Sequence, residues 1–340
     1  MGLALSKRVL CPKCNSATAG LHQNPNICGH CRTYIPDYKN EAAEAIAKPP
    51  RRPKPEVFIS DTVRPLSVTI PKAAPRRTGN TVTALEWGDT HFPFHDPEVL
   101  AIVQAIAEDT QPDWLIHKGD LLDCRHLSRF DKNPGRKESQ QDEIDLAREH
   151  LATMRLASPD SRFVLLEGNH EDRLRQALWR AEGTAAVLTG LRVVQTAMTW
   201  PVLLGLDELR IEFIPYGEQT RADLLPKFIT KHGSLVRGKS GATASAEQAK
   251  YNKSGSSGHT HRLGVVWHRD SNGSHVWVET GCTCLLDPEY CQDPDWQTGC
   301  VFLTFDSETG AVTPEPVFIH NGLGVFRGKT YGSVLPDRAA

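Results

Sequence analysis

The chain has 340 residues, which exceeds one average domain, and 39% hydrophobic with 24% charged residues is typical of a globular protein with a sizeable core. Its formal net charge of −2 excludes a strong overall attraction to nucleic acid or to anionic membranes. No stretch approaches the roughly 20 apolar residues that a bilayer-spanning helix needs, and Ser6-Lys7-Arg8 interrupts any signal-peptide core after Leu5.

The first predicted element is a small zinc ribbon over residues 1–40. Two Cys-x-x-Cys pairs, separated by thirteen residues, each place two sulfurs on one tight turn and together complete a tetrahedral four-thiolate site. A unit of this size buries too little apolar surface to fold alone, so we expect one structural Zn²⁺ to supply its folding energy. Metal-bound thiolates are typical of a reducing compartment, which predicts a cytoplasmic protein. The four predicted zinc ligands are Cys11, Cys14, Cys28 and Cys31.

Residues 41–80 are predicted to form a linker. Seven prolines and eight basic residues fall between Lys48 and Arg77, against two acidic residues, Glu56 and Asp61. This composition favours a semi-extended segment. Its charge has two interpretations, contact with phosphate backbones or an ordinary solvated linker. A zinc ribbon similarly suits either a nucleic-acid or a protein partner.

From residue 81 onward strand patterns alternate with helical patterns, and we predict a domain over residues 81–325 followed by a C-terminal tail, 326–340. Helices are expected at 97–108, capped by Asp96, and at 140–156. This alternation predicts a mostly parallel sheet, with polar residues at the carboxyl ends of its strands, where α/β folds place active sites. The predicted strands are 81–87, 114–117 and 162–166.

Beyond Trp200 the pattern changes to short strands, with one small helix at 243–253. From these strands we predict a second, more antiparallel sheet. They are 210–215, 227–230, 263–268, 275–279, 301–305 and 316–319.

Five short polar clusters follow apolar runs: Gly88-Asp89-Thr90-His91, Gly119-Asp120-Leu121-Leu122-Asp123, Gly168-Asn169-His170-Glu171, Lys231-His232-Gly233 and Gly258-His259-Thr260-His261. Carboxylate, imidazole and amide groups are ligands of divalent cations. Asp89 and His91 are alternate residues of one turn, so both can reach one metal, and Asp120 can bridge two metals about 4 Å apart. The pattern therefore predicts a two-metal hydrolytic centre. Its predicted ligands are Asp89, His91, His261 and the bridging Asp120 for the first ion, and Asn169, His232 and His259 for the second.

In order and spacing these clusters resemble the calcineurin-like metallophosphoesterase superfamily, in its bacterial and phage form. The family pattern D-x-H, G-D-x-x-D, G-N-H-[DE], H-G and G-H-x-H is matched in every element, over roughly residues 81–319. The resemblance implies an α/β fold, a four-layer α-β-β-α sandwich of two mixed sheets with the dinuclear site at one edge. It implies two divalent ions, Mn²⁺ in the first place and Fe, Zn, Ni or Mg as alternatives. Glu171 stands where aspartate is commoner, and we expect this departure to leave the ligands undisturbed.

We predict a metal-dependent phosphoesterase in which a hydroxide bridging the two metals attacks phosphorus in line. By resemblance, His170 is no ligand but a catalytic residue that faces the substrate, where it protonates the leaving oxygen or stabilises the transition state. Asp123 either orients a ligand histidine or caps the following segment. Four side chains after the second and third motifs are candidates to bind phosphate oxygens: Arg125, His126, Arg129 and Arg173.

Four further cysteines lie near the end of the predicted domain. Their spacings do not form zinc knuckles, so we predict free thiols rather than another zinc site. They are Cys282, Cys284, Cys291 and Cys300.

Three functions stay open at this point. The ribbon and the basic linker favour a phosphodiesterase or nuclease acting on nucleic acid or nucleotides. The same ligands would serve a phosphomonoesterase, including a protein phosphatase. A third alternative is a nucleic-acid- or protein-binding module with a vestigial hydrolase scaffold, but the intact ligand set argues against it. No membrane partner is expected, and nothing in the sequence bears on the oligomeric state.

Overall fold

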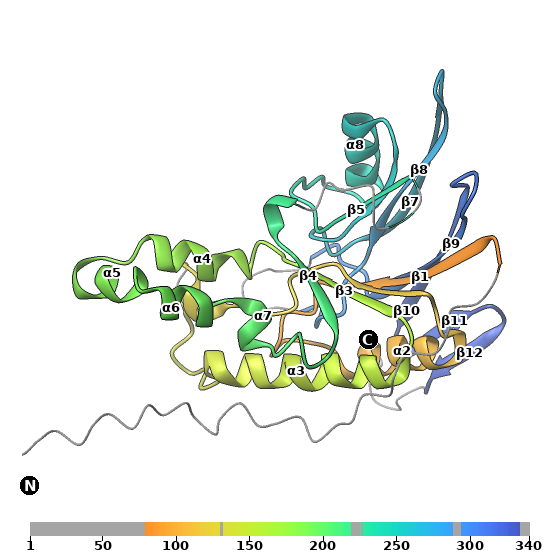
Figure 1. Ribbon diagram of the computed structural model, residues 1–340. Coiled ribbons are helices and arrows are strands. Elements are labelled where there is room, and N and C mark those ends of the chain that lie inside the picture. The colour runs from red at the N-terminus through yellow and green to blue at the C-terminus, as the bar shows by residue number, and fades with distance from the viewer. Residues whose placement is uncertain (1–78, 130–131, 219–224, 226, 288–293, 334–340) are drawn as a thin grey trace, which may run out of the picture. The chain divides into compact units, whose positions relative to one another are not determined.

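The computed structural model describes residues 79–129, 132–218, 225, 227–287 and 294–333 (Figure 1). The predicted zinc ribbon with its four cysteines, most of the predicted linker, and Cys291 lie outside these residues. Among the helices that are described, none combines the length and the apolar character needed to cross a bilayer.

The larger of two β-sheets has eight strands in the order β12-β11-β10-β9-β1-β2-β3-β4. Strands β1, β2, β3 and β4 run parallel to one another, whereas β9 to β12 add on antiparallel at the β1 edge. The sheet is therefore mixed. Its strands are β1 Thr81–Trp87, β2 Trp114–His117, β3 Arg162–Leu166, β4 Ile211–Ile214, β9 Gly299–Asp306, β10 Val312–His320, β11 Leu323–Phe326 and β12 Lys329–Gly332.

The smaller sheet has four strands in the order β5-β6-β8-β7. It is also mixed, because β5, β6 and β8 are parallel neighbours and β7 forms an antiparallel hairpin with β8. Its strands are β5 Phe228–Lys231, β6 Ser254–Ser257, β7 Leu263–Asp270 and β8 Gly273–Thr280.

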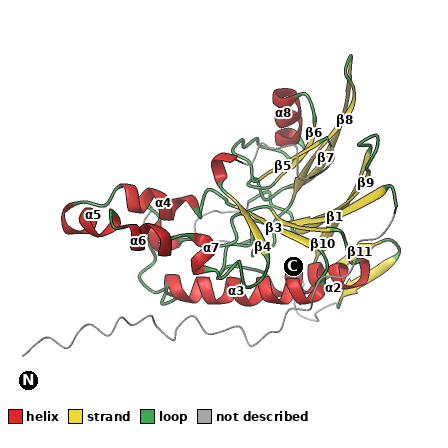
Figure 2. Ribbon diagram, viewed as in Figure 1, coloured by secondary structure: helices red, strands yellow, loops and turns green. Residues whose placement is uncertain are grey.

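Two long helices, α2 (Pro97–Thr110) and α3 (Gln140–Ala157), cover the outer face of the large sheet (Figure 2). Each begins where its sequence provides a cap. Asp96 accepts hydrogen bonds from the backbone N–H groups of Glu98 and Val99, and Ser139 with Asp142 forms a capping box at α3. A third helix, α8 (Ala242–Tyr251), packs on the outer face of the small sheet.

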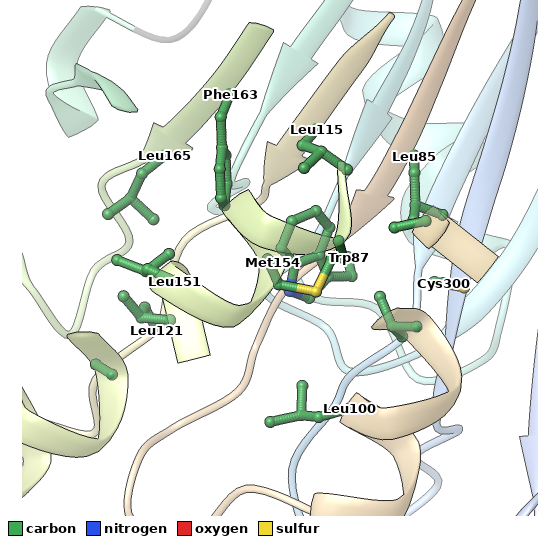
Figure 3. Packing of buried hydrophobic residues seen from close by; sticks show 14 of the residues in the cluster. Leu85, Trp87, Leu100, Leu115, Leu121, Leu151, Met154, Phe163, Leu165 and Cys300 are labelled. Atoms are coloured by element: carbon green, nitrogen blue, oxygen red, sulfur yellow. The ribbon is translucent and has the colours of Figure 1, made fainter. Parts of the chain in front are cut away.

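Three layers of buried side chains hold these elements together. Leu85 and Trp87 of β1 point toward α2 and α3, where they meet Leu100, Leu151 and Met154 (Figure 3). The alternate residue Ala84 faces the other way, into a second cluster shared with Val276 and Val278 of the small sheet. A third cluster, Ile229, Ala244 and Trp277, lies beneath α8. Because strand side chains alternate between faces, the layers stack as helix, sheet, sheet, helix, which confirms the predicted fold class.

Four short helices lie between β3 and β4, and the first three of them extend away from both sheets (Figure 1). They are α4 Asp172–Trp179, α5 Gly183–Thr189, α6 Arg192–Ala197 and α7 Trp200–Leu203; two 3₁₀ turns, η1 Arg125–Leu127 and η2 Tyr216–Glu218, lie elsewhere in the chain.

The prediction of a second sheet from all strands beyond Trp200 was wrong in its membership. Strands β4, β9 and β10 join the large sheet, and only β5, β7 and β8 of the predicted strands form the small one. Strand β6 escaped prediction, because its sequence Ser-Gly-Ser-Ser carries no apolar side chain. It pairs on both sides, and Gly255 packs against the Trp277 ring, where any Cβ would collide. Tertiary packing therefore overrides local propensity here.

Candidate metal centre

Five strand ends converge on one region of the molecule. Asp89, Asp120 and Asn169 follow β1, β2 and β3, which are parallel neighbours in the large sheet. His232 and His259 follow β5 and β6, which are parallel neighbours in the small sheet. Because parallel strands present their carboxyl ends at the same edge, the topology brings together side chains that are up to 170 residues apart.

One group of ligand atoms comes from Asp89, His91 and His261, whose nearest donor atoms all lie within 4.8 Å of one another. The Nε2 atoms of His91 and His261 are 3.0 Å apart, and Asp89 Oδ1 is 3.6 Å from His261 Nε2. All three residues are buried. This is the set predicted for the first ion.

A second group comes from Asp120, His232 and His259, again within 4.8 Å. His232 Nε2 lies 3.4 Å from Asp120 Oδ2 and 3.0 Å from Asn169 Oδ1. The same Asp120 oxygen is 3.7 Å from His91 Nε2 in the first group. One carboxylate therefore stands between the two groups, and the structure brings all seven predicted ligands together.

The outer ring nitrogens of three of these histidines lie near other polar groups. His91 Nδ1 is 3.4 Å from Asp123 Oδ1 but forms no hydrogen bond among the described residues, His232 Nδ1 is 2.8 Å from the Lys118 carbonyl oxygen, and His261 Nδ1 is 3.8 Å from Cys284 Sγ. The hydrogen bond to Lys118 directs His232 Nε2 toward the ligand groups.

Burial and mutual charge shift the ionisation of the centre. Burial raises the pKa of Asp89 to about 7 and lowers the pKa of His259 to about 4. Burial opposes the charged form of His232 as well, but Asp120 and Asp89 outweigh it and raise the pKa of that histidine to about 9. The protonation state of each of these buried groups therefore depends on the charges of the others.

The backbone is strained at five of the seven predicted ligands. Asp89, His91, Asp120, His259 and His261 all have positive φ values, between 48° and 72°. Non-glycine residues rarely adopt this conformation, which costs energy and clusters at functional sites. Of the four glycines that precede ligands, only Gly119 has a positive φ. Gly168 serves a different purpose, since any Cβ there would meet Asp120 Oδ1 and the Asp120 backbone nitrogen.

His170 lies at the edge of the centre. Its Nδ1 is 2.8 Å from the Asp123 carbonyl oxygen and 3.3 Å from Asp123 Oδ1, while its Nε2 is 3.8 Å from Asp120 Oδ2. The side chain is 16% exposed, against 3% for His91. Asp123 contacts both histidines, which corresponds to the orienting alternative considered for this residue.

Of the four candidate phosphate-binding side chains, Arg173 contacts the centre through a hydrogen bond, whereas the hydrogen bonds of Arg125 and His126 lie within the 125–138 loop. Arg173 Nη1 donates to the Asp123 carbonyl oxygen at 2.7 Å, so it lies beside the ligand groups. Arg125 and His126 donate instead to the carbonyl oxygens of Asn133 and Glu138, and Arg129 is exposed. The sequence-based set therefore reaches the centre through Arg173 and extends away from it through the 125–138 loop.

Glu171 has a structural role that the sequence did not reveal. Its side chain turns inward and accepts hydrogen bonds from the backbone N–H groups of Leu122 at 2.7 Å, Gly168 at 2.8 Å and Asp120 at 3.0 Å. Burial, aided by the nearby Asp120, raises the pKa of this carboxyl to about 7. The carboxylate thus ties the second and third motifs together. The one available signal was the glutamate itself, in place of aspartate.

Replacing Glu171 with Ala should lower the free energy of unfolding by roughly 3 kcal/mol, because three buried N–H groups lose their acceptor. Urea unfolding followed by circular dichroism measures this. Glu149→Ala on the exposed face of α3 is the matched control, with an expected change within about 0.5 kcal/mol. Equal effects of the two substitutions would refute the role of Glu171.

The donor set fits a pair of divalent cations. Each group combines carboxylate oxygen with imidazole nitrogen, the ligand mixture that suits borderline ions such as Mn²⁺, Fe²⁺ and Zn²⁺. Asp120 belongs to the second group and also lies 3.7 Å from His91 Nε2 of the first, which is where a bridging carboxylate would stand. His91, Asp120 and His170 also lie within 4.8 Å of one another, so proximity alone does not separate His170 from the ligands.

The chain is similar to one protein family and to several known proteins. The sequence model of the calcineurin-like phosphoesterases matches residues 85–290. Two phage proteins are similar over 250 residues, the gene 54 protein of Mycobacterium phage D29 at 30% identity and that of Mycobacterium phage L5 at 29%. Each match covers 69% of this chain and 92% of the phage protein.

Solved structures with a similar chain course include Vacuolar Protein Sorting 29 from Cryptosporidium parvum, with 11% identity and a TM-score of 0.38 over 75% of this chain and 97% of that chain. Another is YfcE, a phosphoesterase from E. coli, with 13% identity and a TM-score of 0.30 over 69% of this chain and 98% of that chain.

Proposed function

Because this chain belongs to the calcineurin-like phosphoesterase family, and is therefore a metal-dependent phosphoesterase, we propose that it hydrolyses phosphodiesters of nucleic acids or nucleotides. The choice of this substrate rests on the charge of one segment of the sequence. Between Lys48 and Arg77 the chain has eight basic residues against two acidic ones. A segment of that charge, joined to a hydrolase, attracts a polyanion and raises its local concentration.

The predicted ligands would act by holding two cations. When bound, the two cations lower the pKa of water and neutralise charge on phosphate oxygens. Asp89, His91 and His261 would hold one cation, His232, His259 and Asn169 would hold the other, and Asp120 would contact both. These roles rest on the shared position of Asp120, 3.4 Å from His232 and 3.7 Å from His91.

His170 acts on the substrate rather than on the cations. It is more exposed than His91, and Asp123 contacts its Nδ1, which leaves Nε2 to give a proton to the leaving oxygen. Arg173 donates to the Asp123 backbone and so stands where a guanidinium can reach a non-bridging phosphate oxygen.

A substrate panel tests the proposal. Full-length protein stripped of metal with a chelator should be inactive, and Mn²⁺ should restore hydrolysis of bis-p-nitrophenyl phosphate and of single- or double-stranded DNA in preference to p-nitrophenyl phosphate. Preference for the monoester would identify a phosphomonoesterase instead. DNA binding without hydrolysis of any substrate would point to a binding module.

The basic segment provides a separate prediction. Replacing its eight Lys and Arg residues with Gln should weaken DNA binding and flatten its dependence on salt, because fewer counterions are released. Turnover of bis-p-nitrophenyl phosphate, which is too small to contact the segment, serves as the internal control. If the salt dependence of DNA binding stayed unchanged, the basic segment would not take part in binding the substrate.

A further inference from the structure

Two cysteines stand beside the first ligand group. Cys282 and Cys284 are alternate residues of the extended segment that follows β8, so their side chains point to the same side. The segment is anchored on both edges. Cys282 pairs with Thr298 and Cys284 with His95 in isolated bridges, and Cys282 donates its backbone N–H to the Gln297 carbonyl oxygen at 3.0 Å. The backbone that carries the two sulfurs is therefore held on both sides.

The sulfurs converge on His261. Cys282, Cys284 and His261 each offer one donor atom within 4.8 Å of the other two, and all three residues are buried. Cys284 Sγ lies 3.8 Å from His261 Nδ1. His261 thus faces two different donor sets, oxygen and nitrogen on its Nε2 side and sulfur on its Nδ1 side.

We propose that His261 Nδ1, Cys282 Sγ and Cys284 Sγ form a separate binding site for a thiophilic divalent cation such as Zn²⁺ or Cd²⁺. Two sulfurs and one imidazole are a ligand set that such ions bind tetrahedrally, with a fourth position left for water. The set contains no carboxylate, so it disfavours Mn²⁺ and Mg²⁺, which prefer oxygen. Cys282 and Cys284, which the sequence predicted to be free thiols, would then be metal ligands.

Binding at this site would compete with the first ligand group. An ion here takes the lone pair of His261 Nδ1 and displaces one proton from each thiol. The neutral imidazole then carries its remaining proton on Nε2, which can no longer bind a cation beside His91. A thiophilic ion would therefore switch off hydrolysis. This last consequence rests on the proposed function of the centre, whereas the binding site itself does not.

The test uses full-length protein with Mn²⁺, titrated with Cd²⁺. Two signals are followed, turnover relative to each variant's own Mn²⁺ activity, and the ultraviolet charge-transfer absorption of Cd²⁺-thiolate bonds. Cys282→Ala is compared with Cys300→Ala, a matched loss of a buried sulfur from β9. The ribbon cysteines are present in both variants and contribute equally.

Loss of even an outer partner changes metal affinity about 10–100-fold, so loss of a direct ligand should raise the inhibitory Cd²⁺ concentration at least about tenfold in Cys282→Ala. Its charge-transfer amplitude should be smaller than that of Cys300→Ala. Equal inhibition and equal absorption in the two variants would overturn the proposal. If Cys282→Ala does not fold, Cys284→Ala is used in its place. The charge-transfer absorption tests the binding site even if the protein has no measurable turnover.

Discussion

Asp120→Asn is expected to lower kcat on bis-p-nitrophenyl phosphate by at least about 10³-fold, equivalent to about 4 kcal/mol of transition-state stabilisation. The reason is its position between the two ligand groups, 3.4 Å from His232 Nε2 and 3.7 Å from His91 Nε2. The amide keeps the shape of the carboxylate but removes the charge that draws two cations together. Metal content, measured by inductively coupled plasma mass spectrometry, should fall with activity.

The control for this substitution is Asp145→Asn, a carboxylate of the same chemistry on the exposed face of α3. It should keep the activity and metal content of the natural sequence. An Asp120→Asn protein with unchanged metal content and turnover would show that the carboxylate does not bridge cations, and the dinuclear assignment would fail.

His170→Gln should reduce kcat by about 10²–10⁴-fold, the usual contribution of a general acid, with both metals retained. His170 lies at the edge of the centre and is more exposed than His91, with Nδ1 against Asp123 and Nε2 3.8 Å from Asp120. If it protonates the leaving group, substrates with good leaving groups should lose less activity than DNA does.

This prediction separates catalyst from ligand, because metal content is read alongside turnover. Loss of metal in His170→Gln would place His170 among the ligands, as its closeness to His91 and Asp120 also permits. His268→Gln, an exposed histidine on β7, is the control and should behave as the unsubstituted protein does.

Much of the catalytic domain could be predicted from local pattern. Alternation of strand and helix periods located β1, α2, β2, α3 and β3 to within two residues of their observed ends, because each element carries its own caps and apolar spacing. Six of the nine described strands beyond Trp200 were also located, whereas β6, β11 and β12 were missed. The sheet to which each of the six belongs was not predicted. Period-two alternation shows that a strand has a buried face without showing which neighbour buries it.

Three features of the structure depend on contacts between residues far apart in the chain, and local sequence pattern did not predict them. Strand β6 has no apolar residue and exists because β5 and β8 pair with it. Glu171 looked like a neutral replacement, yet it accepts two backbone hydrogen bonds from the second motif and one from Gly168 of its own motif. Cys284 lies 23 residues from His261 in the chain and 3.8 Å from it in space.

The sequence by itself determined the chemistry of this protein, because the identity of a ligand and its place after a strand are local properties of the chain. It predicted seven donors and one catalytic histidine, and it indicated the family to which the chain belongs. Tertiary structure alone decided how those donors are grouped and what surrounds them. Which ring nitrogen faces which partner, and which sulfurs stand behind His261, depend on how two sheets pack, and packing is a property of the whole fold.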